Sequence, residues 1–210
     1  YMEAYHAEAD HIYAVTLSSH LSGSYNSARL GINLFHEKYG DKQIHVFDSE
    51  SASCGETQIA LKIMELEEAG CSFDTIVKKA EEFRDALNTY FVLDNLETLR
   101  KNGRLTGVKA LVASTLNIKP VMGADKGTII QKSQCIGIKK GLAKMAATVA
   151  AEIKDAQDKI LMISHCNCPQ RAESVKQMIL EKVRFKKVLI LETRGISSMY
   201  ANDGGVIVVV

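Results

Sequence analysis

Short apolar runs that alternate with segments of helical periodicity constrain the fold of this chain most strongly. Residues 12–17, 44–47 and 90–93 form three such runs, and the first two end at clusters of Ser, Gly and Asp. Between the runs, apolar side chains recur every three or four residues in segments that start near residues 25, 55 and 73. This order of strands and helices is typical of parallel βαβ units, whose ligands bind at the carboxyl ends of the strands.

The second half of the chain has a different pattern. Two strands, residues 119–124 and 128–136, are expected to form a hairpin that turns at Asp125-Lys126-Gly127. Short helices are expected over residues 94–99 and 108–116. A longer helix is expected after the hairpin, where Leu142, Met145, Val149 and Ile153 are in register, and another helix begins at Pro169. Three further strands are predicted over residues 159–163, 187–191 and 206–210.

We therefore predict an α/β protein with two domains. Residues 1–95 would be the remainder of a parallel βαβ domain that is truncated at its start, because residues 1–10 read as the end of a helix. Residues 96–210 would be a mixed-sheet α/β domain. Whether the end of the chain returns to the first domain is left open.

Charge and cysteine content exclude several classes of function. The 26 basic and 25 acidic side chains nearly cancel, so nucleic acid is not an expected partner. No apolar run approaches the roughly 18 residues of a membrane span, and the five scattered cysteines favour reduced thiols in a cytoplasm. Cys166 and Cys168 follow His165, but their spacing differs from that of zinc ligands. We expect a strand-to-helix turn there and no bound metal.

The loop after the first predicted strand is the main candidate binding site. Four hydroxyls lie close together in this loop, and Gly23 would let a ligand approach the backbone: the residues are Ser18, Ser19, Ser22, Gly23 and Ser24. The helix that follows presents free N–H groups, so the loop suits a carboxylate or a phosphate. A plain serine-rich helix cap is the alternative. Residues 48–53 repeat the arrangement after the second strand.

Arg104 is the candidate cation for the same ligand. It follows a short helix that ends at Gly103, and its guanidinium could balance an anion at the serine loop. The alternative is a cation that stabilises the carboxyl end of a helix. The sequence contains no G-x-S-x-G elbow, phosphate loop or dinucleotide fingerprint, so we predict no catalytic residue and no cofactor.

Four collinear segments resemble the DegV family of bacterial fatty-acid-binding proteins. TLSSHLSGSYNSA (residues 16–28) is similar to T-x-S-S-x-L-S-G-T-Y-x-S-A, and VFDSESASCG (46–55) is similar to V-x-D-S-x-x-x-S-x-G. LETLRKNGRL (96–105) and LNIKPV (116–121) are similar to L-x-x-L-x-[KR]-[GN]-G-R-[IL] and L-x-[IL]-K-P-[IL]. The last segment adds Asn117, Ile118 and Lys119 to the candidate ligand-binding residues.

The resemblance implies that a long-chain fatty acid lies between two domains, of which the second, residues 96–210, covers the lipid. Its carboxylate would lie on small hydroxyl residues and its acyl chain in an apolar tunnel. In some members the bound acid is presented to a separate fatty-acid kinase, and the binding protein itself is not an enzyme. The family normally begins with about 70 further residues. A histidine near the head group occupies the position where this chain has Met199, so the resemblance makes Met199 a further candidate ligand-binding residue.

Two other functions stay open at this point. The first is an enzyme, a transferase or hydrolase that acts on a small phosphorylated or acylated substrate at the same loops. The second is an interaction module in which the serines only cap helices.

Overall fold

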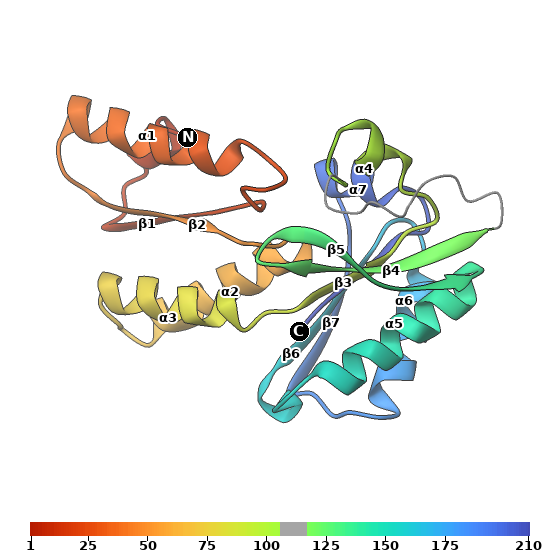
Figure 1. Cartoon of the computed structure of the whole chain (residues 1–210). Coiled ribbons are helices and arrows are strands. Elements are labelled where there is room, and N and C mark those ends of the chain that lie inside the picture. The colour runs from red at the N-terminus through yellow and green to blue at the C-terminus, as the bar shows by residue number, and fades with distance from the viewer. Residues whose placement is uncertain (106–116) are drawn as a thin grey trace. The chain divides into compact units, whose positions relative to one another are not determined.

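The computed structural model describes residues 1–105 and 117–210 (Figure 1). The contacts divide the chain into two compact units, Tyr1–Ala86 and Leu87–Val210. The helix predicted over residues 108–116 lies outside the described residues.

The first unit is a parallel βαβ arrangement, as predicted. Strands β1 (His11–Thr16) and β2 (Gln43–Asp48) pair in parallel, in register from His11 opposite Gln43 to Thr16 opposite Asp48. A parallel pair requires a crossover, which the helix α1 (Ser24–Tyr39) supplies. Two more helices follow, α2 (Cys54–Glu68) and α3 (Phe73–Asp85).

The start of the chain differs from the prediction of a helix end. Residues Ala4–His6 form a single 3-10 turn, η1, and strand β1 follows it. Tyr5 is buried there against Phe35 of α1 and Ile44 of β2. Its hydroxyl donates a hydrogen bond of 3.0 Å to the backbone oxygen of Ala28. The buried ring and the hydroxyl of Tyr5 thus attach this turn to α1 and β2.

The second unit is built on a mixed six-stranded sheet in the order β5-β4-β3-β8-β6-β7. The strands are β3 (Thr89–Val92), β4 (Ile118–Asp125), β5 (Thr128–Ile136), β6 (Ile160–His165), β7 (Lys187–Glu192) and β8 (Val206–Val209). The helices are α4 (Glu97–Lys101), α5 (Ile138–Glu152), α6 (Pro169–Leu180) and α7 (Gly195–Ala201), with a 3-10 turn η2 (Ala156–Asp158). β6 and β7 are parallel, and the other pairs are antiparallel.

The predicted hairpin is confirmed in detail. Asp125 pairs with Thr128, so Lys126 and Gly127 form a two-residue turn between β4 and β5. Both turn residues have positive φ, 45° and 79°. Such turns match the right-handed twist of the flanking strands.

The strand partners of β3 differ from the prediction. Residues 90–93 were expected to be a third parallel strand of the first domain. β3 instead lies inside the six-stranded sheet and pairs antiparallel with β4 and β8. All four of its residues are buried. A short run that is buried on both faces shows no alternation, so its sequence does not distinguish parallel from antiparallel partners.

The core of the second unit lies on one face of this sheet, under α5 and α6 (Figure 1). Tyr90, Val92, Ile163 and Val208 point towards these helices and are fully buried. Side chains alternate along a strand, so the neighbouring residues point to the opposite face. That second face carries the apolar side chains of Phe91, Met122, Met162, Ile207 and Val209.

Candidate functional site

The serine loop connects β1 to α1, as predicted. Ser18 is fully buried. Its backbone oxygen accepts hydrogen bonds from the amides of Leu21 and Ser22, at 2.9 and 3.0 Å. Ser18 therefore anchors a tight turn inside the unit, which leaves Ser19, Ser22 and Ser24 as the partly exposed serines of the loop.

The second polar loop, between β2 and α2, is bonded directly to the first. The amide of Ser18 donates to the oxygen of Ser51 at 3.0 Å, and the amide of Ser49 donates to the oxygen of Thr16 at 3.1 Å. Parallel strands end at the same edge of a sheet, and here Thr16 and Asp48 are register partners. The two loops that the sequence marked as similar are thus hydrogen-bonded side by side at the carboxyl ends of β1 and β2.

Most amides of the serine loop are used internally. The amide of Ser19 donates to Asp48 Oδ1 at 3.0 Å, that of His20 to Ser18 Oγ at 3.3 Å, and that of Ser24 to Ser22 Oγ at 3.2 Å. In the part of the chain that the structure describes, the amides of Gly23, Tyr25 and Asn26 have no hydrogen-bond partner. These three donors belong to the first turn of α1, where the helix dipole favours negative charge.

Two hydroxyls complete the donor set beside this helix start. Ser22 Oγ accepts the amide of Ser24, so its own proton remains available to a ligand. The Ser19 hydroxyl has no partner among residues 1–105 and 117–210. Gly23 has an ordinary φ of −70°, and a Cβ at this position would meet no atom within 4 Å. The glycine is therefore not required by the turn, and it leaves open space next to the free amides.

The loop after β2 ends at Ser53, whose backbone conformation is uncommon for a residue other than glycine. Ser53 has a φ of 57°, and its amide donates to Glu56 Oε1 at 3.0 Å in a capping box at the start of α2. Burial raises the pKa of Glu56, and the hydrogen bond from Ser53 opposes that change only in part.

In the second unit, the remaining candidate residues gather at one edge of the sheet. β3 and β6 end at this edge, and β4 and β8 begin there. Lys119 donates from Nζ to the backbone oxygen of Asp94 and lies 4.0 Å from its carboxylate. Asn117 and Ile118 precede Lys119 at the start of β4. Met199 lies on α7 with its side chain about half exposed.

Asp94 is the centre of a charged cluster that the sequence did not indicate. Arg171, from α6, forms an ion pair with the Asp94 carboxylate and donates to the oxygen of Gly204 at 2.7 Å. Thr98 Oγ1 donates to Asn202 Oδ1 at 3.1 Å and so attaches α4 to the loop after α7. These bonds fix the loop that ends in Gly204, but no sequence motif links residues so far apart.

Arg104 takes a position at the carboxyl end of α4. Its amide donates to the oxygen of Leu99 at 2.8 Å, and its guanidinium contacts the oxygen of Asn102. This geometry agrees with a cation that stabilises the end of a helix. That Arg104 also balances an anion at the serine loop stays a prediction.

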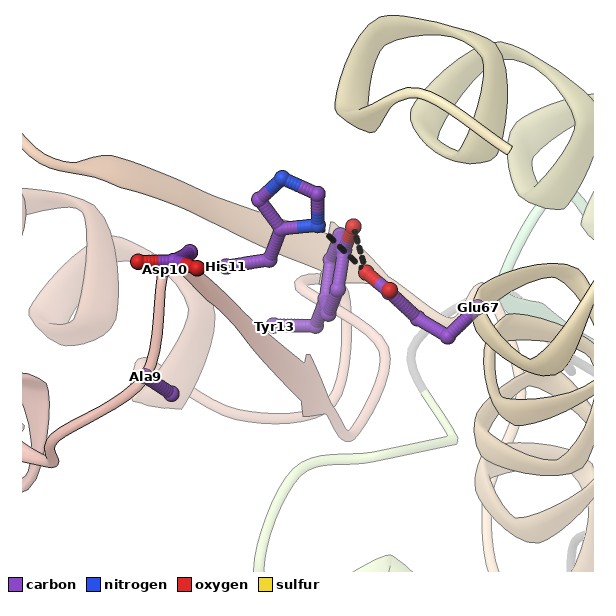
Figure 2. Close-up of a pocket in the computed structure, with 5 residues that line it drawn as sticks. All are labelled: Ala9, Asp10, His11, Tyr13 and Glu67. Carbon is purple, nitrogen blue, oxygen red and sulfur yellow. Dashed lines mark hydrogen bonds and ion pairs between the residues drawn. The ribbon is translucent and has the colours of Figure 1, made fainter. Parts of the chain in front are cut away.

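An open pocket of about 380 Å³ lies at the other end of β1 (Figure 2). Figure 2 shows His11 and Tyr13 directed towards Glu67 of α2, and both are 2.6 Å from Glu67 Oε1. Hydrogen bonds from Tyr13 and then His11 lower the pKa of Glu67, whereas burial and the same carboxylate raise the pKa of Tyr13. The pocket lies at the start of β1 and the serine loop follows its end, so the two are separate features.

Metal and membrane features can be stated for residues 1–105 and 117–210. In this part of the chain, no three His, Cys, Asp or Glu side chains are grouped as metal ligands. Cys168 is buried, and its sulfur contacts the oxygen of Gly205 at 3.5 Å. None of the described helices is both long enough and apolar enough to cross a membrane.

Known proteins resemble this chain over its whole length. The profile of the DegV family, described as an uncharacterised protein family, matches residues 1–210. A DegV domain-containing protein from Streptococcus gordonii is 32% identical over 99% of this chain and 73% of its own length. One from Clostridium perfringens is 31% identical over 90% of this chain, which spans 65% of that relative.

Solved structures agree with the fold. A DegV family protein from Ruminococcus gnavus, with vaccenic acid, is 57% identical and has a TM-score of 0.96 over 100% of this chain and 75% of its own. The Streptococcus pneumoniae fatty acid kinase (Fak) B3 protein, loaded with linoleic acid, is 30% identical with a TM-score of 0.90, over 100% of this chain and 74% of its own. Fold, motifs and sequence identity together show that this chain belongs to the DegV family.

Proposed function

We propose that this chain binds a long-chain fatty acid and holds its carboxylate at the start of α1. The observation that carries the proposal is the structure of the Ruminococcus gnavus protein with vaccenic acid, which is 57% identical over the whole chain. The free amides of Gly23, Tyr25 and Asn26, together with the hydroxyls of Ser19 and Ser22, supply donors of the kind a carboxylate needs.

The acyl chain needs an apolar surface of its own. In the second unit, the sheet face that points away from α5 and α6 carries Phe91, Met122, Met162, Ile207 and Val209. We propose that the acyl chain binds an apolar surface of this kind. Burial at about 0.8 kcal/mol per methylene gives roughly 12 kcal/mol for a chain of about 16 carbons, before the costs of association. The apolar tail would therefore supply most of the affinity, and the head-group donors would set its orientation.

We further propose that this protein is a carrier, and that it presents the bound acid to a fatty-acid kinase. The solved relative from Streptococcus pneumoniae is described as a fatty acid kinase B3 protein loaded with linoleic acid, which supports this role. The donors at the start of α1 are amides and hydroxyls, which suit holding a carboxylate in place. We also propose Arg104, Asn117, Ile118, Lys119 and Met199 as ligand-binding residues, on the strength of the family motifs that contain or flank them.

The proposal can be tested by titrating delipidated protein with vaccenic acid in a calorimeter. Ser19→Ala and Ser22→Ala each remove a hydrogen bond to a charged group, so we expect the Kd to rise about 10-fold or more. Ser27→Ala is the matched control, because Ser27 is an exposed serine of the same helix. No binding by the unmodified protein would refute the function. Binding that neither variant weakens would refute the head-group assignment.

A further inference from the structure

Asp48 occupies a special position between the two polar loops. It is the last residue of β2 and the register partner of Thr16 at the end of β1. From this position its side chain reaches both loops of the carboxyl edge. Arg84, on α3, donates to the backbone oxygen of Asp48 at 3.4 Å and helps to fix this residue.

One carboxylate oxygen of Asp48 holds an amide from each loop. Asp48 Oδ1 accepts the amide of Ser19 at 3.0 Å and the amide of Glu50 at 3.1 Å. Glu50 has a φ of 49°, a conformation that is uncommon for a residue other than glycine, so its loop needs such a restraint. Two further hydrogen bonds between the loops join backbone atoms, from Ser18 to Ser51 and from Ser49 to Thr16.

Both hydrogen bonds of the Asp48 carboxylate go to loop amides, so its effect on a ligand would act through the loops. The bond to Ser19 fixes the backbone next to a hydroxyl that has no partner in the described part of the chain. If that bond is lost, the Ser19 amide and hydroxyl can rotate, and the turn that leads into α1 loses its side-chain link to the end of β2, although the backbone bonds between the loops remain. We propose that Asp48 is a positioning residue: it sets the serine loop in the geometry that receives the fatty-acid carboxylate, an inference that rests on the proposed function.

Two substitutions separate the hydrogen bonds of Asp48 from its charge. Asp48→Asn keeps one side-chain oxygen that can accept both amides, whereas Asp48→Ala removes the acceptor altogether. We expect Asp48→Ala to raise the Kd for vaccenic acid about 10-fold and Asp48→Asn to stay within about 3-fold of the unmodified protein. Asp41→Ala is the matched control, because Asp41 is an exposed aspartate that precedes the same strand.

A neutral ligand distinguishes positioning from a general loss of structure. The alcohol with the same acyl chain as vaccenic acid has no carboxylate to place. Asp48→Ala should therefore weaken binding of the acid more than binding of the alcohol, whereas a damaged fold would weaken both equally. Equal loss of both ligands, no loss with Asp48→Ala, or equal loss with Asp48→Asn and Asp48→Ala would overturn the proposal.

Amide hydrogen exchange measured by NMR tests the positioning without any ligand. The amides of Ser19 and Glu50 should be protected in the unmodified protein and in Asp48→Asn, and they should exchange at least 10-fold faster in Asp48→Ala. If Asp48→Ala does not fold, loss of this protection in Asp48→Asn would refute the proposal. Protection that behaves as expected in a protein that binds no vaccenic acid would refute the proposed function and retain the role of Asp48 in the loop.

Discussion

The substitution Gly204→Ala tests how the charged cluster of the second unit holds its loop. Gly204 has a φ of 85°, and an added Cβ would overlap the Asp94 carboxylate and the Arg171 guanidinium. The left-handed backbone alone costs alanine about 1–2 kcal/mol. The overlap also separates the ion pair between Asp94 and Arg171, whose side chains are each one-third exposed. We assign this separation about 1 kcal/mol, at the upper end of the range for exposed pairs.

Loss of the 2.7 Å bond from Arg171 to the Gly204 oxygen adds about 1 kcal/mol. The free energy of unfolding should therefore fall by roughly 3–4 kcal/mol in total, a large part of the stability of an average domain. Urea denaturation followed by circular dichroism measures this change. Gly103→Ala is the matched control, since Gly103 has a φ of 70° and open space around it.

The control should lose only the backbone contribution of about 1–2 kcal/mol. The difference between the two variants then reports the displaced ion pair and hydrogen bond. If Gly204→Ala destabilises the protein no more than Gly103→Ala does, the cluster does not hold the loop, and the reasoning is wrong.

Two further predictions concern acid sensitivity and turn chemistry. Hydrogen bonds from Tyr13 and His11 hold the pKa of Glu67 below its ordinary value of 4.5, so its stabilising effect is complete above that pH and is lost as the pH falls through the lower, folded-state pKa. Glu67→Gln should therefore lose stability less steeply below pH 4.5 in acid titrations. If its free energy of unfolding falls with pH as steeply as that of the unmodified protein, the assignment is wrong. Lys126→Asn should raise the free energy of unfolding by about 0.5 kcal/mol, because asparagine tolerates the φ of 45° in the β4–β5 turn better than lysine does. A lower urea midpoint for Lys126→Asn would refute that reading.

Much of the serine site could be predicted because it follows from general geometry. Parallel strands bring their carboxyl ends to one edge, so two serine-rich loops after successive strands had to lie side by side. The free donors were harder to predict. The side-chain oxygens of Ser18 and Ser22 accept hydrogen bonds from loop amides, and that of Asp48 accepts one from the Ser19 amide. Such local bonds depend on side-chain orientations that the order of residues does not reveal.

Contacts between residues far apart in the sequence could not be predicted, for a different reason. The contacts of Asp94 with Arg171, and of Tyr13 with Glu67, join residues 77 and 54 positions apart, with no motif connecting them. Helix α7 was missed because its short sequence, GISSMYA, contains a glycine and two serines and few strong helix formers. The membership of β3 in the second sheet depends on its partners, which a four-residue apolar run does not specify.

The position of the fatty-acid carboxylate is the central claim, and amide chemical shifts measure it directly. Vaccenic acid labelled with ¹³C at the carboxyl carbon can be titrated into ¹⁵N-labelled, delipidated protein. We predict that the largest shift changes occur at Gly23, Tyr25 and Asn26, with contacts from the labelled carbon to the same amides. Saturable binding that leaves these three amides unchanged would contradict the account.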